Sequence, residues 1–241
     1  MKIIVSTCDK YDHLMPGFAW CFNKYWPGQT VDVVGYRQPP VLPDNFCFHS
    51  LNPIDDRPFT YYLRPFIASL PQEYFVFLFD DYWMLEPIAP ILVSVMEQEV
   101  KLGADKGDLS TNTNHFPNGL YKSMGPGNPK LVEATQTAPY RTSTQPCVWT
   151  RKYMLKLMQP YGMTPWEFEL QGTANNDGGI IVGTEMQIYK YANVYLKGKP
   201  DDYHISRISP ADREQLRLLG YRDIEKGQLN YEACKACPTT S

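Results

Sequence analysis

The chain has 241 residues, of which 43% are hydrophobic and 14% aromatic, with a formal net charge of −3. This size and apolar content suit a single α/β domain with a large core. The mild acidity argues against a broadly basic nucleic-acid surface, although a local basic cleft stays open. Its apolar runs are strand-sized, and the N-terminal MKIIVSTCDK becomes polar too early for a signal peptide. We therefore expect no membrane span and a cytoplasmic location.

Six cysteines are scattered along the chain, at positions 8, 21, 47, 147, 234 and 237. They are too sparse for a disulfide scaffold, so mostly reduced core thiols are expected. Cys234 and Cys237 form a CxxC pair, but no second pair stands at zinc spacing. This favours incidental tail cysteines over a metal or redox site.

The first third of the chain alternates short apolar runs with amphipathic segments. The predicted elements are strands at 2–6, 31–36 and 46–51, and helices at 14–26 and 57–70. This order implies parallel strand pairing with right-handed crossovers. No G-x-G-x-x-G turn follows the first strand and no Walker A sequence is present, so classical dinucleotide-binding and P-loop functions lose their main support.

Residues 74–83, YFVFLFDDYW, form the stretch around which the rest is arranged. The apolar run is too short for a helix and is typical of a strand buried on both faces, in the middle of a sheet. Asp80 and Asp81 follow it directly, at the strand end where ligands of open α/β sheets bind. Two adjacent carboxylates need compensation, and hard divalent cations prefer such oxygens. The alternative is that Asp80 caps the turn while Asp81 is solvated.

The second part of the chain is less periodic. We predict a helix at 87–102, a strand at 107–112, a long loop at 112–140, an extended segment at 141–149, a helix at 150–160 capped by Thr150, strands near Ile180 and Ile188, and a charged terminal helix. The long loop either shapes a substrate pocket or is a flexible insertion.

The segment TPWEFE at 164–169 carries two glutamates on one short helix. Thr164 before Pro165 fits a helix start, and Glu167 in the first turn is favoured there by the helix dipole. Capping alone can explain Glu167. Glu169 lies about 200° further round the helix, so one glutamate can face a cleft while the other faces water.

Several blocks taken together resemble a known family. STCDKYDHLMPGFAWCFNKYWP, FDDYW, QPCVWTRKYMLKLMQP and TPWEFE, in this order and spacing, resemble a little-characterised family of bacterial and phage glycosyltransferases of the GT-A type. The resemblance covers most of residues 1–200. It implies a single GT-A-like (Rossmann-like) α/β domain over 1–230, with a central mostly parallel sheet flanked by helices. Residues 1–110 would be the nucleotide-sugar-binding half, 111–230 the acceptor half and 231–241 a C-terminal tail.

The resemblance also implies where the donor and its metal bind. Asp80 and Asp81 stand at the D-x-D-like motif that holds a divalent metal, Mn²⁺ or Mg²⁺, on the donor pyrophosphate. Because the sequence here is DDY, one carboxylate or both could touch the metal. We favour Asp81 as the ligand and Asp80 as a donor-binding residue. The expected donor is a nucleotide-sugar, with a UDP-sugar as the first choice.

Five further residues are assigned to the donor side or to its metal. Thr7 and Asp9, at the end of the first strand, would lie near the nucleoside, while Arg57 and Arg64 face either phosphate or the polar edge of the core. His204 completes the metal site or is an ordinary surface histidine.

For the acceptor, an inverting transfer needs a carboxylate base at the hydroxyl. Glu169 is the first candidate and Glu167 the second. The acceptor is a sugar or another hydroxyl-bearing group: a glycan, a small molecule or, if the chain is phage-encoded and acts in the host cytoplasm, a hydroxymethylated base in DNA.

Two other classes of function stay open. One is a nucleotidyltransferase acting on sugar phosphates, although the glycine-rich phosphate loop usual in that class is absent after the first strand. The other is a non-catalytic carbohydrate-binding protein, whose sugars would stack on Trp83, Trp149 or Trp166.

Overall fold

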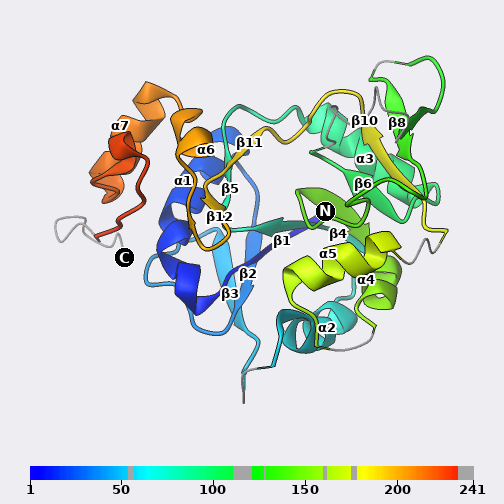
Figure 1. The fold of residues 1–241 in the computed structure, drawn as a ribbon, viewed down its shortest axis with the longest axis horizontal. Coiled ribbons are helices and arrows are strands. Elements are labelled where there is room, and N and C mark those ends of the chain that lie inside the picture. Colours follow the sequence, from blue (N-terminus) through cyan, green and yellow to red (C-terminus); the bar gives the residue numbers. More distant parts are fainter. Residues whose placement is uncertain (54–56, 111–120, 128, 160–161, 175–177, 233–241) are drawn as a thin grey trace.

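The computed structural model describes residues 1–53, 57–110, 121–127, 129–159, 162–174 and 178–232. At its centre lies one nine-stranded sheet with the strand order β3-β2-β1-β4-β9-β6-β10-β8-β7 (Figure 1). The strands are β1 (Lys2–Ser6), β2 (Val31–Gly35), β3 (Phe46–Ser50), β4 (Tyr74–Phe79), β6 (Lys106–Asp108), β7 (Tyr121–Ser123), β8 (Leu131–Ala134), β9 (Cys147–Thr150) and β10 (Ile181–Thr184). In this sheet β9 and β8 run against the others, so it is mixed but mostly parallel.

Strand β4 has the central position that its sequence predicts. It pairs with β1 in parallel on one side and with β9 in antiparallel on the other. Its four middle residues are fully buried, and alternate ones belong to different cores: Val76 and Leu78 to one, Phe75 and Phe77 to the other. A strand covered on both faces gains no benefit from polar residues at alternate positions, which explains the continuous apolar run.

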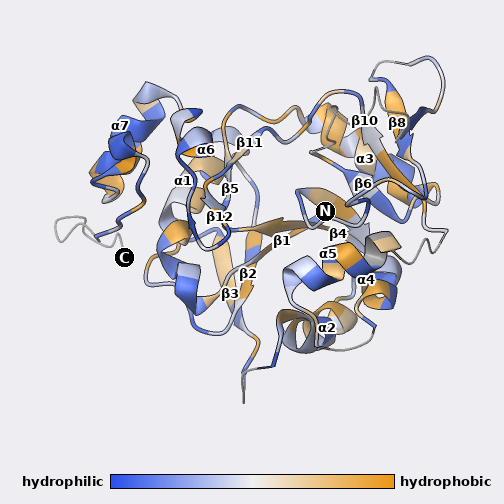
Figure 2. Cartoon of the chain, viewed as in Figure 1, coloured by the Kyte–Doolittle hydropathy of each residue, from blue (hydrophilic) through white to orange (hydrophobic). Residues whose placement is uncertain are grey.

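Helices cover both faces of the sheet. The first core packs α1 (Met15–Tyr25) and α3 (Pro90–Lys101) against one face. The second core packs α2 (Phe59–Ser69), α4 (Arg151–Leu157) and α5 (Pro165–Ala174) against the other. Figure 2 shows the apolar strands enclosed between these layers.

A smaller sheet lies beside α1. There β5 (Tyr82–Met84) pairs with β11 (Tyr191–Asn193) in an antiparallel two-stranded sheet. The remaining elements are the 3-10 helices η1 (Asp9–Leu14) and η3 (Ile224–Lys226), the hairpin of β12 (Tyr195–Leu196) and β13 (Lys199–Pro200), and helices α6 (Asp202–Ser206) and α7 (Pro210–Leu219). Helix α7, which is the most hydrophilic in Figure 2, contacts α1. Among the described residues, every helix is too short or too polar to cross a bilayer.

Four local predictions are wrong. The predicted loop at 112–140 contains the short strands β7 and β8. Strands this short leave no recognisable pattern in a stretch rich in Gly and Pro. The segment 141–149 is extended only from Cys147, because residues 141–146 form buried turns. Ile188 is buried in an irregular segment, and the strand begins at Tyr191. His204 lies on α6 instead of in a loop, because Asp201 caps that helix by accepting from the His204 backbone N–H at 2.8 Å.

Part of the sequence interpretation falls on residues outside the described ranges. The predicted tail at 231–241 is described only at 231 and 232, so Cys234 and Cys237 lie outside. Within the predicted loop, residues 111–120 and 128 also lie outside.

Candidate active site

Two polar side chains lie at the carboxyl ends of the neighbouring strands β1 and β4. These strands end side by side, with Ser6 opposite Phe79. The next residues along each chain segment, Thr7 and Asp80, are buried and joined: Thr7 Oγ1 donates to Asp80 Oδ2 at 2.6 Å. At the end of β2, a Cβ on Gly35 would lie 2.8 Å from Thr7 Cγ2, so only glycine leaves room for this arrangement.

The backbone at Asp80 is fixed by an aromatic side chain from the next strand. Trp83 Nε1 donates to the Asp80 carbonyl at 3.0 Å, and the indole is fully buried. It packs directly on Gly17 of α1, where an added Cβ would lie 2.2 Å from the ring. The Tyr221 ring contacts it edge to face, with the centroids 5.2 Å apart. The turn after β4 therefore rests on a packed aromatic layer.

Asp81 has a different environment from its neighbour. Its Oδ1 is buried and has no hydrogen-bond partner within the described part of the chain. With the Asn193 amide turned so that its nitrogen faces Asp81, that amide donates to Asp81 Oδ2 at 3.1 Å. Burial, together with the charge of Glu169, raises the pKa of Asp81 to about 7. Burial and the charge of Asp81 likewise raise the pKa of Asp80, although the Thr7 hydrogen bond opposes this.

Glu169 faces the same group of side chains from α5. Its Oε1 accepts from the Thr144 backbone N–H at 2.5 Å and from Thr144 Oγ1 at 2.6 Å. Its backbone carbonyl accepts from Thr142 Oγ1 at 3.0 Å. The turns at 141–146 thus hold this carboxylate in one orientation, close enough for its charge to act on Asp81.

Two tyrosines lie near the carboxylates. The Tyr82 and Tyr191 rings contact each other with centroids 4.9 Å apart. Burial and the charges of Asp81 and Glu169 raise the pKa of both hydroxyls, which places both rings near these acids and keeps them neutral.

A buried ion pair supports the site from β6. Lys106 Nζ lies 2.7 Å from Asp108 Oδ1, donates to the Arg141 carbonyl at 3.3 Å, and lies over the Trp149 ring. Burial alone would lower the pKa of Lys106, but Asp108 and further negative groups outweigh it and the pKa is raised. The lysine therefore keeps its charge and partly balances the nearby acids.

Glu167, the second candidate base, has a different position from Glu169. Its Oε2 accepts from both Thr164 N and Thr164 Oγ1 at 2.8 Å, while the Glu167 N–H donates to Thr164 Oγ1 at 3.2 Å. This reciprocal pattern is a capping box at the start of α5. It lowers the pKa of the exposed Glu167 carboxyl. The capping alternative thus accounts for Glu167 in full.

The other predicted donor residues have protein partners of their own. Asp9 Oδ1 accepts from the Arg37 backbone N–H at 3.0 Å. The Arg57 guanidinium lies over the Tyr61 ring at 4.3 Å from its centroid. Arg64 on α2 donates to the Gln159 amide oxygen at 2.9 and 3.1 Å when that amide is oriented to accept.

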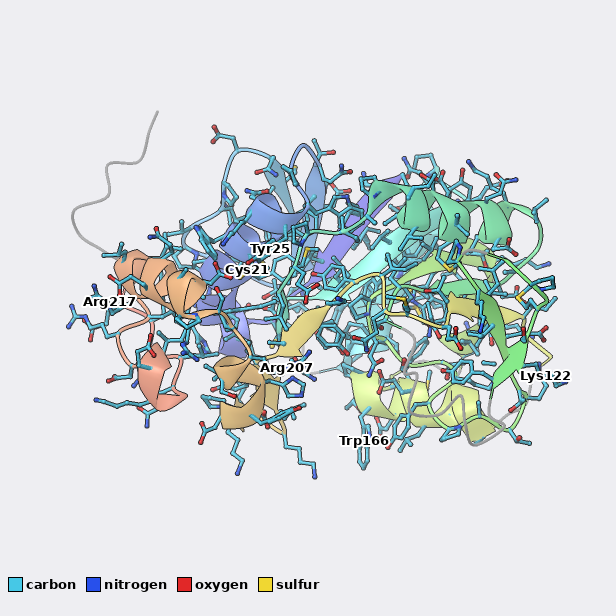
Figure 3. All side chains as sticks on the ribbon, turned by 90° about the horizontal axis from the view of Figure 1, so that it is seen from above. Cys21, Tyr25, Lys122, Trp166, Arg207 and Arg217 are labelled. Atoms are coloured by element: carbon cyan, nitrogen blue, oxygen red, sulfur yellow. The ribbon has the colours of Figure 1, made fainter. Side chains whose placement is uncertain are left out.

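His204 lies near the site, where it contacts Asn193, the residue whose amide faces Asp81. Its Nδ1 accepts from the Asn193 backbone N–H at 3.3 Å and lies 3.4 Å from Arg207 Nη1. Because Nδ1 acts as an acceptor, the proton of the neutral ring is on Nε2. Among the described residues, Asp80, Asp81 and His204 do not form a group of three side chains that could hold a metal ion. Figure 3 shows Arg207 beside α6.

Of the residues at this edge of the sheet, Asp81 is the one best suited to bind a divalent cation. Within the described ranges the buried Asp81 Oδ1 lacks a donor, and a carboxylate oxygen is a preferred ligand of Mg²⁺ and Mn²⁺. Asp80 offers less, because one of its oxygens already accepts from Thr7.

Sequence reasoning missed Thr144, Asn193, Tyr82 and Tyr191. Thr144 lies in a polar turn with no periodic signal, and the others lie on strands of three residues. Of the tryptophans considered for sugar stacking, Trp83 and Trp149 are fully buried and are excluded from that role. Trp166 is 63% exposed and points outward from α5 in Figure 3.

Comparisons with known proteins find similarity in structure only. No protein-family model matches the chain, and no curated protein matches its sequence. The crystal structure of S. aureus TarS 1-349 matches with a TM-score of 0.50 and 16% identity, over 98% of this chain and 68% of that one. The galactosyltransferase LgtC, solved with donor and acceptor sugar analogs, gives 0.45 and 12%, over 76% of this chain and 73% of that one.

A third match is the bifunctional IspDF from Campylobacter jejuni, with a TM-score of 0.47 and 11% identity. It covers 87% of this chain but only 54% of that one, so the chain spans about half the length of that protein. The likeness to TarS covers nearly the whole chain. The chain therefore has the GT-A-like α/β fold that its sequence blocks predict.

Proposed function

We propose that this chain is a metal-dependent glycosyltransferase that moves a sugar from a nucleotide-sugar to an acceptor hydroxyl. The observation that carries the proposal is that the buried Asp81 Oδ1, at the carboxyl end of the central strand, has no hydrogen-bond partner among the described residues, while the oriented carboxylate of Glu169 is close enough to raise the pKa of Asp81. Open α/β sheets bind their ligands at this edge. A cation on one acid and a fixed base on the other are the two groups that a metal-dependent, inverting glycosyl transfer uses.

Asp81 would hold the metal, Mn²⁺ or Mg²⁺, which when bound neutralises charge on the leaving nucleoside diphosphate as a Lewis acid. Thr7 and Asp80 orient the turn that presents Asp81 and stand next to the expected nucleoside. A proton on His204 Nε2 suits a donor to a phosphate oxygen better than a metal ligand. The first donor to test is a UDP-sugar, in the half formed by residues 1–110.

Glu169 would act on the acceptor, in the half formed by residues 111–230. Thr144 holds its Oε1 through two hydrogen bonds, so the carboxylate is pre-oriented and pays little ordering entropy when an acceptor arrives. In an inverting transfer it accepts the proton of the attacking hydroxyl. The acceptor hydroxyl belongs to a glycan, a small molecule or a hydroxymethylated base.

The test is donor turnover by the purified chain. We expect release of nucleoside diphosphate from at least one nucleotide-sugar in a panel that starts with UDP-sugars, dependent on Mn²⁺ or Mg²⁺ and abolished by chelator. Asp81→Asn should remove both metal-dependent donor binding, measured calorimetrically, and turnover. Asp44→Asn, which changes an exposed acid elsewhere, is the matched control and should behave as wild type.

Other outcomes contradict the proposal in distinct ways. Pyrophosphate release from a nucleoside triphosphate and a sugar phosphate would make the chain a nucleotidyltransferase. Sugar binding without any metal-dependent turnover would make it a carbohydrate-binding protein. Unchanged donor affinity in Asp81→Asn would remove this residue from the metal site.

A further inference from the structure

A second group of metal-binding side chains lies on the edge strands of the sheet. Asp32 on β2 stands directly opposite Cys47 on β3, and His49 follows two residues later on the same face. In the described ranges it is the only group of three or more His, Cys, Asp or Glu side chains whose ligand atoms converge. These atoms all lie within 4.8 Å of one another.

The distance between Asp32 and His49 is close to that of two ligands in a tetrahedral site. His49 Nε2 lies 3.0 Å from Asp32 Oδ1. A zinc ion bonded to both at about 2.0–2.1 Å would need these atoms roughly 3.3 Å apart. Cys47 is exposed, so rotation of its short side chain can bring the sulfur in. The His49 ring is already placed by contact with Phe66 of α2, with centroids 5.6 Å apart.

The group has its own cation in this structure. Lys2 of β1 forms an ion pair with Asp32 Oδ2, on the same side of the sheet. Asp32 and His49 are both half-buried. The negative charge of Asp32 is neutralised by Lys2, a side chain with about a third of its surface exposed. A metal ion entering the group would replace Lys2 as the counter-charge.

This group is separate from the candidate active site. Asp32 is the second residue of β2, whose last residue, Gly35, packs against Thr7 at the opposite end of the strand. Parallel strands place their amino ends at one edge and their carboxyl ends at the other. His49 stands opposite Val34, so the group lies along the β2–β3 pair and contains none of the residues assigned to the donor or the acceptor.

We propose that Asp32, Cys47 and His49 form a Zn²⁺ site that joins the edge strand β3 to β2. Thiolate, imidazole and carboxylate together are a ligand set for zinc, whereas Mg²⁺ and Mn²⁺ prefer oxygen alone. Three protein ligands leave the fourth position for water. In the part of the chain that the structure describes, strand β3 pairs with β2 alone, so a metal bond across this pair restrains the exposed edge of the sheet.

The experiment titrates the full chain, stripped with chelator and kept reduced, with Co²⁺ and then with Zn²⁺. The background carries Cys234→Ser and Cys237→Ser, so that the CxxC pair cannot contribute. We expect a thiolate-to-Co²⁺ charge-transfer band that Zn²⁺ abolishes, and a higher melting temperature with Zn²⁺. Cys47→Ser should remove the band, and His49→Ala should weaken binding by more than about tenfold.

Two further variants sharpen the test. Lys2→Met should strengthen Zn²⁺ binding, because the competing cation on Asp32 is gone, whereas a merely structural ion pair would give only a loss of stability. Cys8→Ser, a partly buried cysteine outside the group, should leave the band unchanged. A band that persists in Cys47→Ser, or no binding by the parent chain, would overturn the proposal. Turnover of nucleotide-sugars is not a readout here, so the outcome is independent of the proposed function.

Discussion

Adjacent residues at the end of one strand have unlike surroundings. Asp80 has a hydroxyl donor from Thr7 and a backbone held by Trp83, so it is a structural acid as much as a functional one. Asp81 has one oxygen without a donor among the described residues. The hypothesis that Asp81 is the metal ligand and that Asp80 sets the turn agrees with this difference and awaits the binding experiment.

The raised pKa of Asp81 predicts how the metal-free chain responds to pH. In the unfolded chain this carboxyl ionises near its ordinary pKa, but in the folded chain only at about 7. The folded state thus binds the extra proton, and its advantage is fully present below the ordinary carboxyl pKa, falls as the pH rises and is lost once the pH has passed about 7. Asp81→Asn, which stays neutral, should therefore gain stability over wild type at alkaline pH, on the order of 4 kcal/mol.

Urea unfolding at several pH values without metal measures this effect. The two chains should have nearly equal stability below the ordinary carboxyl pKa, diverge as the pH rises from there to about 7, and keep a constant difference above it. Asp44→Asn should show no such divergence. Adding Mn²⁺ should reverse the order at alkaline pH, because the metal stabilises only the chain that binds it. A constant difference between the chains at all pH values would contradict the assignment of the shift to Asp81.

Glu169 and Glu167 form a matched pair on one helix. Glu169→Gln should retain fold and donor binding yet lower turnover by roughly 10²- to 10⁴-fold, if the carboxylate is a general base. Glu167→Gln keeps an acceptor for the capping box, so it should cost only about 0.5 kcal/mol of stability, through the lost charge at the helix start, and leave turnover unchanged. Steady-state rates at saturating acceptor separate the two. If Glu169→Gln only raises KM, the residue binds the acceptor instead of taking its proton.

At the scale of elements, the turn after β4 depends on one contact between helix and strand. Gly17 of α1 leaves room for the buried Trp83 ring, and the Trp83 N–H holds the Asp80 carbonyl. A methyl group on Gly17 would overlap the ring. The position of the candidate metal-binding turn is therefore fixed by packing on α1, about sixty residues earlier in the chain.

We predict that Gly17→Ala destabilises the fold by about 1–3 kcal/mol, because the helix must move away from the indole. Alanine normally favours a helix over glycine, so a loss of stability would be specific to this contact. In Gly17→Ala combined with Trp83→Phe, the smaller ring should recover part of the loss, and unfolding by urea measures this coupling. Strict additivity of the two changes would show that the ring is not the obstacle.

The predictable part of this fold is the part with strong periodicity. The run at 74–79 identified the central strand, and Thr164 with Pro165 identified the start of α5. Short strands such as β7 and the turns at 141–146 were missed, because pairing and burial of distant segments determine them instead of local propensity. Thr144 contacts Glu169 and Asn193 contacts Asp81 only after folding. For the same reason, neither residue has a signature in the sequence.

At the scale of the whole molecule, the end of the described chain supports its beginning. Lys24 and Tyr25 at the end of α1 both bond the buried Asp212 of α7, and the latter contact is 2.5 Å. Tyr221 reaches the start of α1, where its hydroxyl donates to the His13 carbonyl at 2.7 Å and accepts from the Gly17 N–H at 2.8 Å. The C-terminal segment is thus part of the support beneath the site.

Tyr221→Phe tests this long-range support. The ring and its contact with Trp83 remain, but the Gly17 N–H and the His13 carbonyl lose their partner in a buried place. We expect a loss of about 1–3 kcal/mol in unfolding free energy. Because α1 then holds Trp83 less firmly, metal-dependent donor affinity should also fall, whereas Tyr203→Phe, at a ring that is 71% exposed, should change neither quantity. If Tyr221→Phe loses stability but keeps donor affinity, the C-terminal segment stabilises α1 without positioning Asp80 and Asp81.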